Sequence, residues 1–248
     1  MQNNLNLYKL ILHCQRDINL SSVVNTFSIC EKDRFFIDNL YKSIQLYPES
    51  NWNDALSMGQ ISSKLWLIEE LKKLNLDLGV VFVCAGWLGT LPALIFKDGN
   101  LKYKCFRSFD IDPQCADAAD TLNKDPYVIN DWQFKATTED IFKINYYNHP
   151  FQCWSKTNNR MSYPVDTIPD TIINTSCDHV DPFSKWWNMI PDNKLVILQN
   201  NDSKIDDDHV NNISSLDEMK AQAPMKMVLF EGTLALPKYN RYMLIGRK

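Results

Sequence analysis

The clearest feature in the hydrophobic pattern of this chain is an uninterrupted apolar run from Val80 to Cys84. A glycine-bearing turn, 85–90, follows it at once, and an apolar segment from Leu91 to Phe96 comes next. A short strand that is apolar at every position is typical of a parallel sheet that is covered on both faces. The pattern therefore predicts the first half of a parallel strand–helix–strand unit.

The alternation of strands and helices then continues to the end of the chain. Only a short connection, Gly232 to Pro237, joins the last two predicted strands. It is too brief for a crossover helix, so these two strands should pair antiparallel. We predict an α/β fold with five parallel strands, a closing hairpin, and helices on both faces. The predicted strands are 80–84, 103–109, 132–137, 171–174, 194–199, 226–230 and 239–245, and the predicted helices between them include 90–97 and 181–189.

The part of the chain before the first strand has a different pattern. Apolar residues recur at helical spacing over 31–47 and 60–76, which predicts two helices. We therefore expect an N-terminal helical extension over 1–76 and a main domain over 77–248. Segment 145–169 has no helical period, and a loop of this length is often functional. It is either a lid over a pocket or an ordered surface excursion.

The composition fits an ordinary enzyme, with 45% hydrophobic residues, 23% charged residues and a net charge of -4. An acidic chain argues against nucleic acid as the main partner and favours a small molecule. No apolar segment reaches the roughly 20 residues that span a bilayer, and the first residues do not resemble a signal peptide. We expect a cytoplasmic protein without a membrane partner, and its oligomeric state is left open. The seven cysteines form no CxxC pair and the four histidines do not cluster with them, so no metal site is predicted.

Polar residues follow several predicted strands at the point where each strand ends. Asp110 ends the second strand, the stretch 174–179 follows the fourth, and 199–202 follows the fifth. Ligands of open α/β sheets bind at the carboxyl ends of the strands, where the strand order reverses. Together with the glycine turn, these residues predict a nucleotide-type site. Asp110 is our candidate for binding a ribose, and the alternative is a helix-capping carboxylate.

In its strand pattern, the chain resembles the class I S-adenosylmethionine-dependent methyltransferases over roughly residues 64–248. That family has a seven-stranded, mostly parallel, Rossmann-like sheet of order 3-2-1-4-5-7-6 with an antiparallel last strand. Its motif after the first strand is an acidic residue followed by glycines. Here Gly86 matches the first glycine, whereas Cys84 stands at the acidic position and Leu88 at the middle glycine.

The resemblance implies S-adenosylmethionine as cofactor and assigns roles to residues that match the family's motifs. Asp110 would accept hydrogen bonds from both ribose hydroxyls, and Ile111 would pack on the adenine. The other positions implied to contact the cofactor are Cys84, Ala85, Gly86, Trp87 and Gly89 in the turn, Thr138, Glu139 and Asp140 at the adenine edge, and Asn174 and Thr175 after the fourth strand.

Asp178 and His179 are a candidate acid/base pair, because an imidazole takes up a proton near neutral pH. The alternative is that Asp178 caps the helix beginning near Asp181 and His179 simply packs. We interpret His209 as a solvated loop residue. Gln60, Ser63 and Lys64 are interpreted as surface capping, with closure over the cofactor carboxylate as the alternative.

The sequence therefore predicts a methyltransferase that uses S-adenosylmethionine and acts on a small-molecule acceptor. On the same fold and cofactor, the alternative is transfer or cyclisation of the aminocarboxypropyl arm, or cofactor cleavage. Three lesser alternatives are a nucleic-acid methyltransferase, an NAD-binding Rossmann protein and a cofactor-binding module without catalysis. The turn has only two glycines, Gly86 and Gly89, whereas an NAD site prefers three.

Overall fold

The computed structural model describes residues 31–248, apart from 125–132, 153, 156–158 and 204–208. Two sequence predictions fall outside this part of the chain. They are residues 1–30 of the N-terminal extension and the start of the third strand at Trp132.

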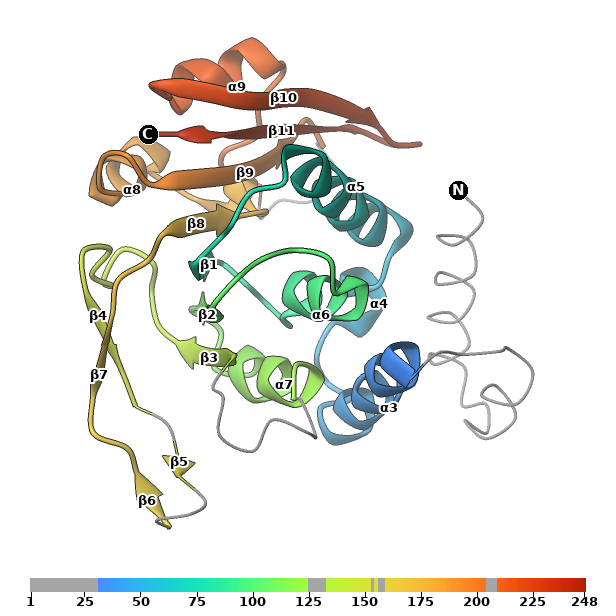
Figure 1. The fold of residues 1–248 in the computed structure, drawn as a ribbon. Coiled ribbons are helices and arrows are strands. Elements are labelled where there is room, and N and C mark those ends of the chain that lie inside the picture. The colour runs from blue at the N-terminus through green and yellow to red at the C-terminus, as the bar shows by residue number, and fades with distance from the viewer. Residues whose placement is uncertain (1–30, 125–132, 153, 156–158, 204–208) are drawn as a thin grey trace.

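A seven-stranded sheet lies at the centre of the described structure (Figure 1). Its order is β3-β2-β1-β8-β9-β11-β10, and the first five of these strands are parallel. β11 is antiparallel to both neighbours, β9 and β10. The predicted α/β sheet, its order and its antiparallel closing strand are thus confirmed. The bounds are β1 (Val80–Cys84), β2 (Cys105–Asp110), β3 (Phe134–Thr138), β8 (Thr171–Asn174), β9 (Leu195–Asn201), β10 (Met227–Ala235) and β11 (Asn240–Arg247).

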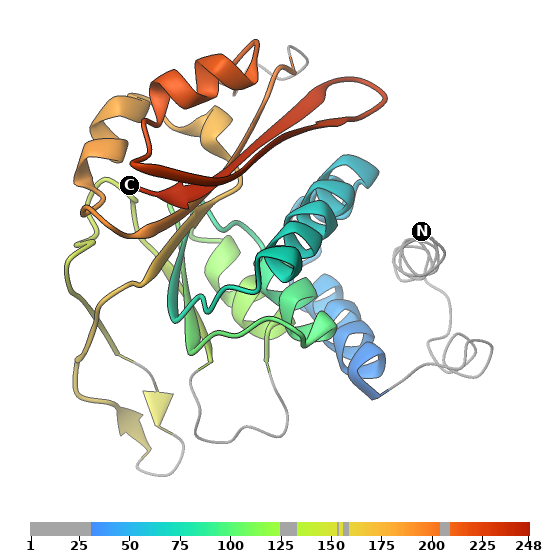
Figure 2. The same cartoon turned by 45° about the horizontal axis from the view of Figure 1, so that its top comes forward.

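Helices cover both faces of the sheet, as Figures 1 and 2 show. On one face, α3 to α7 share a hydrophobic core with the sheet, and on the other face α8 and α9 share a second core with it. The bounds are α3 (Glu31–Leu46), α4 (Trp52–Ala55), α5 (Met58–Leu74), α6 (Thr90–Asp98), α7 (Cys115–Leu122), the 3-10 turn η1 (Cys177–His179), α8 (Phe183–Met189) and α9 (Leu216–Gln222).

Strand β1 shows why its sequence is apolar throughout. Val81 and Val83 belong to the core under α3 to α7, whereas Val80 and Phe82 belong to the core under α8 and α9. Successive side chains of a strand point to opposite faces, so a central strand between two cores needs an apolar residue at every position. The helices of the predicted extension belong to the first core, and the domain boundary at residue 76 stays a prediction.

Segment 145–169 forms two short antiparallel ladders, which the sequence does not predict. β4 (His149–Phe151) pairs with β7 (Val165–Thr167), and β5 (Trp154–Ser155) pairs with β6 (Arg160–Met161). In Figures 1 and 2 this ribbon leaves the edge of the sheet next to β3. The described residues of this segment thus form paired strands, and both interpretations of the segment, as a lid and as a surface excursion, stay predictions.

Within the part of the chain that the structure describes, no helix combines the length and apolar character needed to cross a bilayer.

Candidate functional site

The turn after β1 is held against the end of β2 by backbone hydrogen bonds. The Gly86 N–H donates to the Phe109 carbonyl at 3.0 Å. The Trp87 N–H donates to Asp110 Oδ2 at 2.7 Å. The first two predicted parts of the nucleotide site are therefore in direct contact.

Gly86 is required by this close approach of the turn to β2. A Cβ atom at position 86 would lie 2.0 Å from Ser108 Oγ, far inside van der Waals contact. The glycine therefore allows the turn to lie on the neighbouring strand, which in turn brings the Trp87 N–H to Asp110.

The substitution Gly86→Ala should destabilise the protein by about 1–3 kcal/mol, the usual cost of overpacking. Urea unfolding measures this change. The double variant Gly86→Ala/Ser108→Ala removes the clashing hydroxyl and should recover most of the loss. Equal stability of the single and double variants would contradict this packing explanation.

Asp110 combines a buried environment with unused hydrogen-bonding capacity. Its Oδ1 accepts the Asp112 N–H at 3.0 Å, while Oδ2 accepts the Trp87 N–H. Burial raises the pKa of Asp110, while these backbone donors act to lower it. The Ile111 N–H is a third backbone donor that acts on this carboxylate. Since a carboxylate has about four acceptor positions, one or two remain for a ligand.

The residues predicted beside Asp110 lie where the sequence places them. Thr138 pairs with Asp110 in the register of β2 and β3, and the Glu139 N–H donates to the Asp110 carbonyl at 2.9 Å. The Glu139 carboxylate is 3.0 Å from His149 Nε2. Ile111 is 71% exposed, although it follows directly on a buried strand. A single exposed apolar residue is ordinary on a protein surface, so the contact of Ile111 with an adenine stays a prediction.

Two departures from the glycine motif have structural consequences. The Cys84 side chain is buried in the second core, with Sγ 3.4 Å from the Tyr146 hydroxyl. Burial raises the pKa of Cys84 to about 12, so the thiol is neutral and only the backbone of residue 84 is available to a ligand. The Leu88 side chain lies in the first core. The Cys84 side chain therefore cannot accept a hydrogen bond from a ligand as the family's acidic residue would. The Leu88 side chain contributes to the core.

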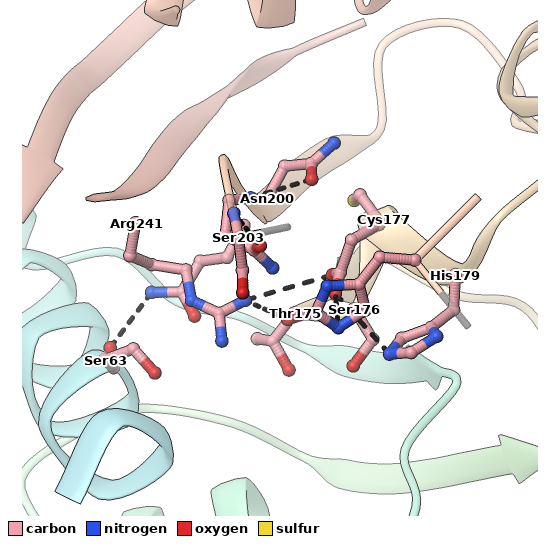
Figure 3. Close-up of polar contacts among 12 residues, drawn as sticks. Ser63, Thr175, Ser176, Cys177, His179, Asn200, Ser203 and Arg241 are labelled. Atoms are coloured by element: carbon pink, nitrogen blue, oxygen red, sulfur yellow. Dashed lines mark hydrogen bonds and ion pairs between the residues drawn. The ribbon is translucent and has the colours of Figure 1, made fainter. Parts of the chain in front are cut away.

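At the end of β8, Asn174 and Thr175 are held by polar contacts. Asn174 Oδ1 accepts the Ser176 N–H at 2.8 Å, and the Thr175 carbonyl accepts from Arg241 Nη1 at 3.4 Å (Figure 3). Asn174 Nδ2 is buried and has no hydrogen-bond partner within the described ranges. A buried amide donor of this kind needs a partner, and a ligand at the strand end would supply one.

Asp178 is the centre of a group of charged and titratable side chains. Its Oδ2 lies 3.4 Å from His179 Nε2 and 3.1 Å from His209 Nε2. Arg241 Nη1 lies 3.9 Å from Oδ1. The interpretation of His209 as a solvated loop residue is wrong, because its side chain is only 11% exposed and contacts Asp178. Asp178 does not cap the next helix, since the N-cap of α8 is Pro182 without a side-chain bond.

Lys64 brings a further cation to this region from α5. Its Nζ donates to Gln60 Oε1 at 2.6 Å, and the Ser63 carbonyl accepts from Gln199 Nε2 at 2.9 Å. Surface capping is therefore wrong for Ser63 and Lys64, which are both buried. Burial and the nearby charge of Arg241 lower the pKa of Lys64 to about 7.

Two residues of this region are missed by sequence reasoning. Arg241 is assigned to no site, and Lys64 is assigned to the surface. For Arg241 a signal exists, because β11 runs antiparallel and its first residues therefore lie at the carboxyl edge of the parallel strands. For Lys64 the signal is its position on α5 between Ile61 and Ile68, which are both in the core.

Comparison with known proteins gives no relative by sequence: no family model matches the chain, and neither does any curated protein. Solved structures do match. One is a SAM-dependent methyltransferase from Leishmania major, with 9% identity, a TM-score of 0.51, and coverage of 91% of this chain and 89% of that one. Another is the N-methyltransferase NodS from Bradyrhizobium japonicum in complex with S-adenosylhomocysteine, with 7% identity, a TM-score of 0.51, and coverage of 84% and 98%. The chain thus has the fold of class I methyltransferases.

Proposed function

We propose that this protein binds S-adenosylmethionine and transfers its methyl group to a small-molecule acceptor. The observation that carries the proposal is Asp110 at the tip of β2. It is tied to the turn after β1, retains acceptor capacity, and has the exposed Ile111 beside it. A ribose with two hydroxyl donors and an adenine that needs an apolar surface match this arrangement.

The other end of the site also has groups that suit the cofactor. Asn174 Nδ2 is a buried donor that has no described partner. Lys64 and Arg241 are buried basic residues that would attract the carboxylate of a methionine moiety, Lys64 in its protonated form. The residues present therefore fit S-adenosylmethionine from its adenine to its carboxylate, although the usual acidic residue of the turn is missing.

Bound S-adenosylmethionine supplies an electrophilic methyl group on a sulfonium. The chain supplies alignment of the acceptor and a place for its proton. His179 is 45% exposed and Asp178 only 3%, so the imidazole faces solvent while the carboxylate holds it from within. His179 would take the proton of the acceptor, and Asp178 would stabilise the imidazolium that forms. The net charge of -4 supports a small acceptor over a nucleic acid.

Calorimetry with S-adenosylmethionine, S-adenosylhomocysteine and NAD tests the cofactor assignment. Binding of the first two ligands and not of NAD is expected. The acceptor can then be sought by incubating the protein with a small-molecule extract and S-adenosylmethionine that carries a deuterated methyl group. Mass spectrometry would identify the labelled product. Binding of NAD alone would overturn the proposal.

Transfer of the aminocarboxypropyl arm is the second candidate, and the changed turn favours it. Cys84 and Leu88 leave the amino end of the cofactor without its usual partners, so the orientation of that arm would be fixed by other residues. The two reactions release different products from the cofactor. Methyl transfer leaves S-adenosylhomocysteine, whereas transfer of the arm leaves methylthioadenosine, and mass analysis separates them.

The substitution His179→Ala should lower kcat by roughly 100-fold, the lower end of what a general base contributes, and leave cofactor affinity unchanged. The reason is that the proposal gives His179 a contact with the acceptor and none with the nucleoside. Turnover with the identified acceptor and calorimetry with S-adenosylhomocysteine measure the two effects. Full turnover by this variant would contradict the assignment of His179 as the base.

A further inference from the structure

Three potential metal ligands meet at one point beside the end of β8. They are Asp178 and His179 in η1 and His209 in the segment that follows β9. One ligand atom from each residue lies within 4.8 Å of the other two. The two imidazole rings also contact each other edge to face, with their centroids 4.8 Å apart. Residues separated by about thirty positions in sequence thus converge on one carboxylate.

The distances match the edges of a metal coordination polyhedron. Ligand atoms bound to zinc at about 2.0–2.1 Å in a tetrahedron are about 3.3 Å apart. The two nitrogen–carboxylate distances here are 3.1 and 3.4 Å. Both imidazoles approach through Nε2, and both approach the same oxygen, Asp178 Oδ2. Two of the three donor–donor distances are therefore close to the spacing of bound ligands, and the third, between the two histidines, is no longer than 4.8 Å.

The carboxylate itself is not satisfied by the surrounding protein. Asp178 is almost completely buried, and no described residue donates a hydrogen bond to its Oδ1. Arg241 Nη1 is 3.9 Å away from that oxygen, which is an ionic contact without a hydrogen bond. A buried carboxylate without full pairing is costly. A cation on the Oδ2 side would complete its partners, while Arg241 remains on the Oδ1 side.

We propose that Asp178, His179 and His209 bind a divalent first-row transition-metal ion. Two imidazoles and one carboxylate are a ligand set of catalytic zinc and non-haem iron(II) sites. The hard ions Mg²⁺ and Ca²⁺ instead require oxygen ligands, so they should not bind here. Three protein ligands leave coordination positions open. A consequence that rests on the proposed function is that, with the ion bound, His179 would act as a metal ligand in place of its role as the base, and the ion would activate the acceptor.

Metal binding can be measured without any acceptor or cofactor. The purified protein is stripped with a chelator and titrated with Co²⁺, whose visible absorption reports imidazole and carboxylate ligation. Zn²⁺ competition then gives its affinity. We expect one equivalent of Co²⁺ to bind. His179→Ala and His209→Ala should each weaken binding by more than the roughly 10- to 100-fold that loss of an outer-shell partner costs.

His149→Ala is the matched control. His149 also pairs with a carboxylate, Glu139, at 3.0 Å, but this pair is not part of a three-ligand group among the described residues. The variant His149→Ala should bind Co²⁺ with the wild-type affinity. His179 is the safer of the two ligand variants because its side chain is partly exposed, and circular dichroism confirms folding of each variant. Absence of Co²⁺ binding to the wild type would overturn the proposed metal site. Equal Co²⁺ affinities of the wild type and all three histidine variants would also overturn it. Neither result bears on binding of S-adenosylmethionine.

Discussion

Replacing Asp110 by alanine should abolish binding of S-adenosylmethionine, and the milder Asp110→Asn should weaken it by roughly 1,000-fold. Each hydrogen bond to a charged group contributes about 1.5–3 kcal/mol, and a ribose would make two to this carboxylate. Asparagine keeps the size of the side chain and one oxygen, so it can still accept the Trp87 N–H that orders the turn. The amide nitrogen can no longer accept the Asp112 N–H, so the free energy of unfolding of Asp110→Asn is measured beside its affinity. Calorimetry with S-adenosylhomocysteine measures the affinity.

Asp112→Asn is the control for this substitution. Asp112 lies two residues further on, is exposed, and its Oδ1 accepts the Gln114 N–H at 2.9 Å. Asp112→Asn removes one negative charge from the same loop and keeps the Asp112 N–H that donates to Asp110. Affinity should stay within a few-fold of wild type. Equal losses in the two variants would mean that the effect is general electrostatics, and unchanged affinity in Asp110→Asn would place the ribose elsewhere.

The sheet could be predicted because each of its features leaves a local signal. The central strand β1 is a continuous apolar run and β9 begins with one, and the closing hairpin is identified by the short connection between β10 and β11. The elements that the sequence does not predict lack such signals. α4 spans only four residues, too few for a clear helical period, and the ladders of 145–169 are only two or three residues long.

For the site, the sequence predicts residues that directly follow a strand and misses those that arrive by tertiary packing. Asp110 and Asp178 follow β2 and β8, so the topology alone places them at the carboxyl edge. His209 lies in a polar stretch, and nothing local indicates that its ring packs against Asp178. Lys64 lies between the core residues Ile61 and Ile68 of α5, which indicates the inner side of the helix but not the partners that a buried ammonium finds there. Its burial depends on how α5 docks on β9, through contacts such as Gln199 with Ser63.

Lys64→Met should stabilise the protein, because methionine keeps the length of the side chain and removes a buried charge. Lowering the pKa of Lys64 from 10.5 to about 7 corresponds to about 5 kcal/mol. Stability rises with pH wherever the unfolded chain binds more protons than the folded protein. Below about pH 7 both states are protonated and the full cost is present. Between about pH 7 and 10.5 the folded protein has lost a proton that the unfolded chain retains, so the cost decreases.

Urea unfolding of wild type and Lys64→Met at about pH 6 and pH 9 tests this dependence. The gain in free energy of unfolding should approach 5 kcal/mol at the lower pH and fall to roughly 2 kcal/mol at the higher one. Lys73→Met is the matched control, since Lys73 lies on the same helix with its side chain 67% exposed. It should change stability by less than about 1 kcal/mol at either pH. A loss of stability in Lys64→Met at both values would mean that Gln60 and the nearby carboxylates fully satisfy the charged ammonium, and that burial does not depress its pKa.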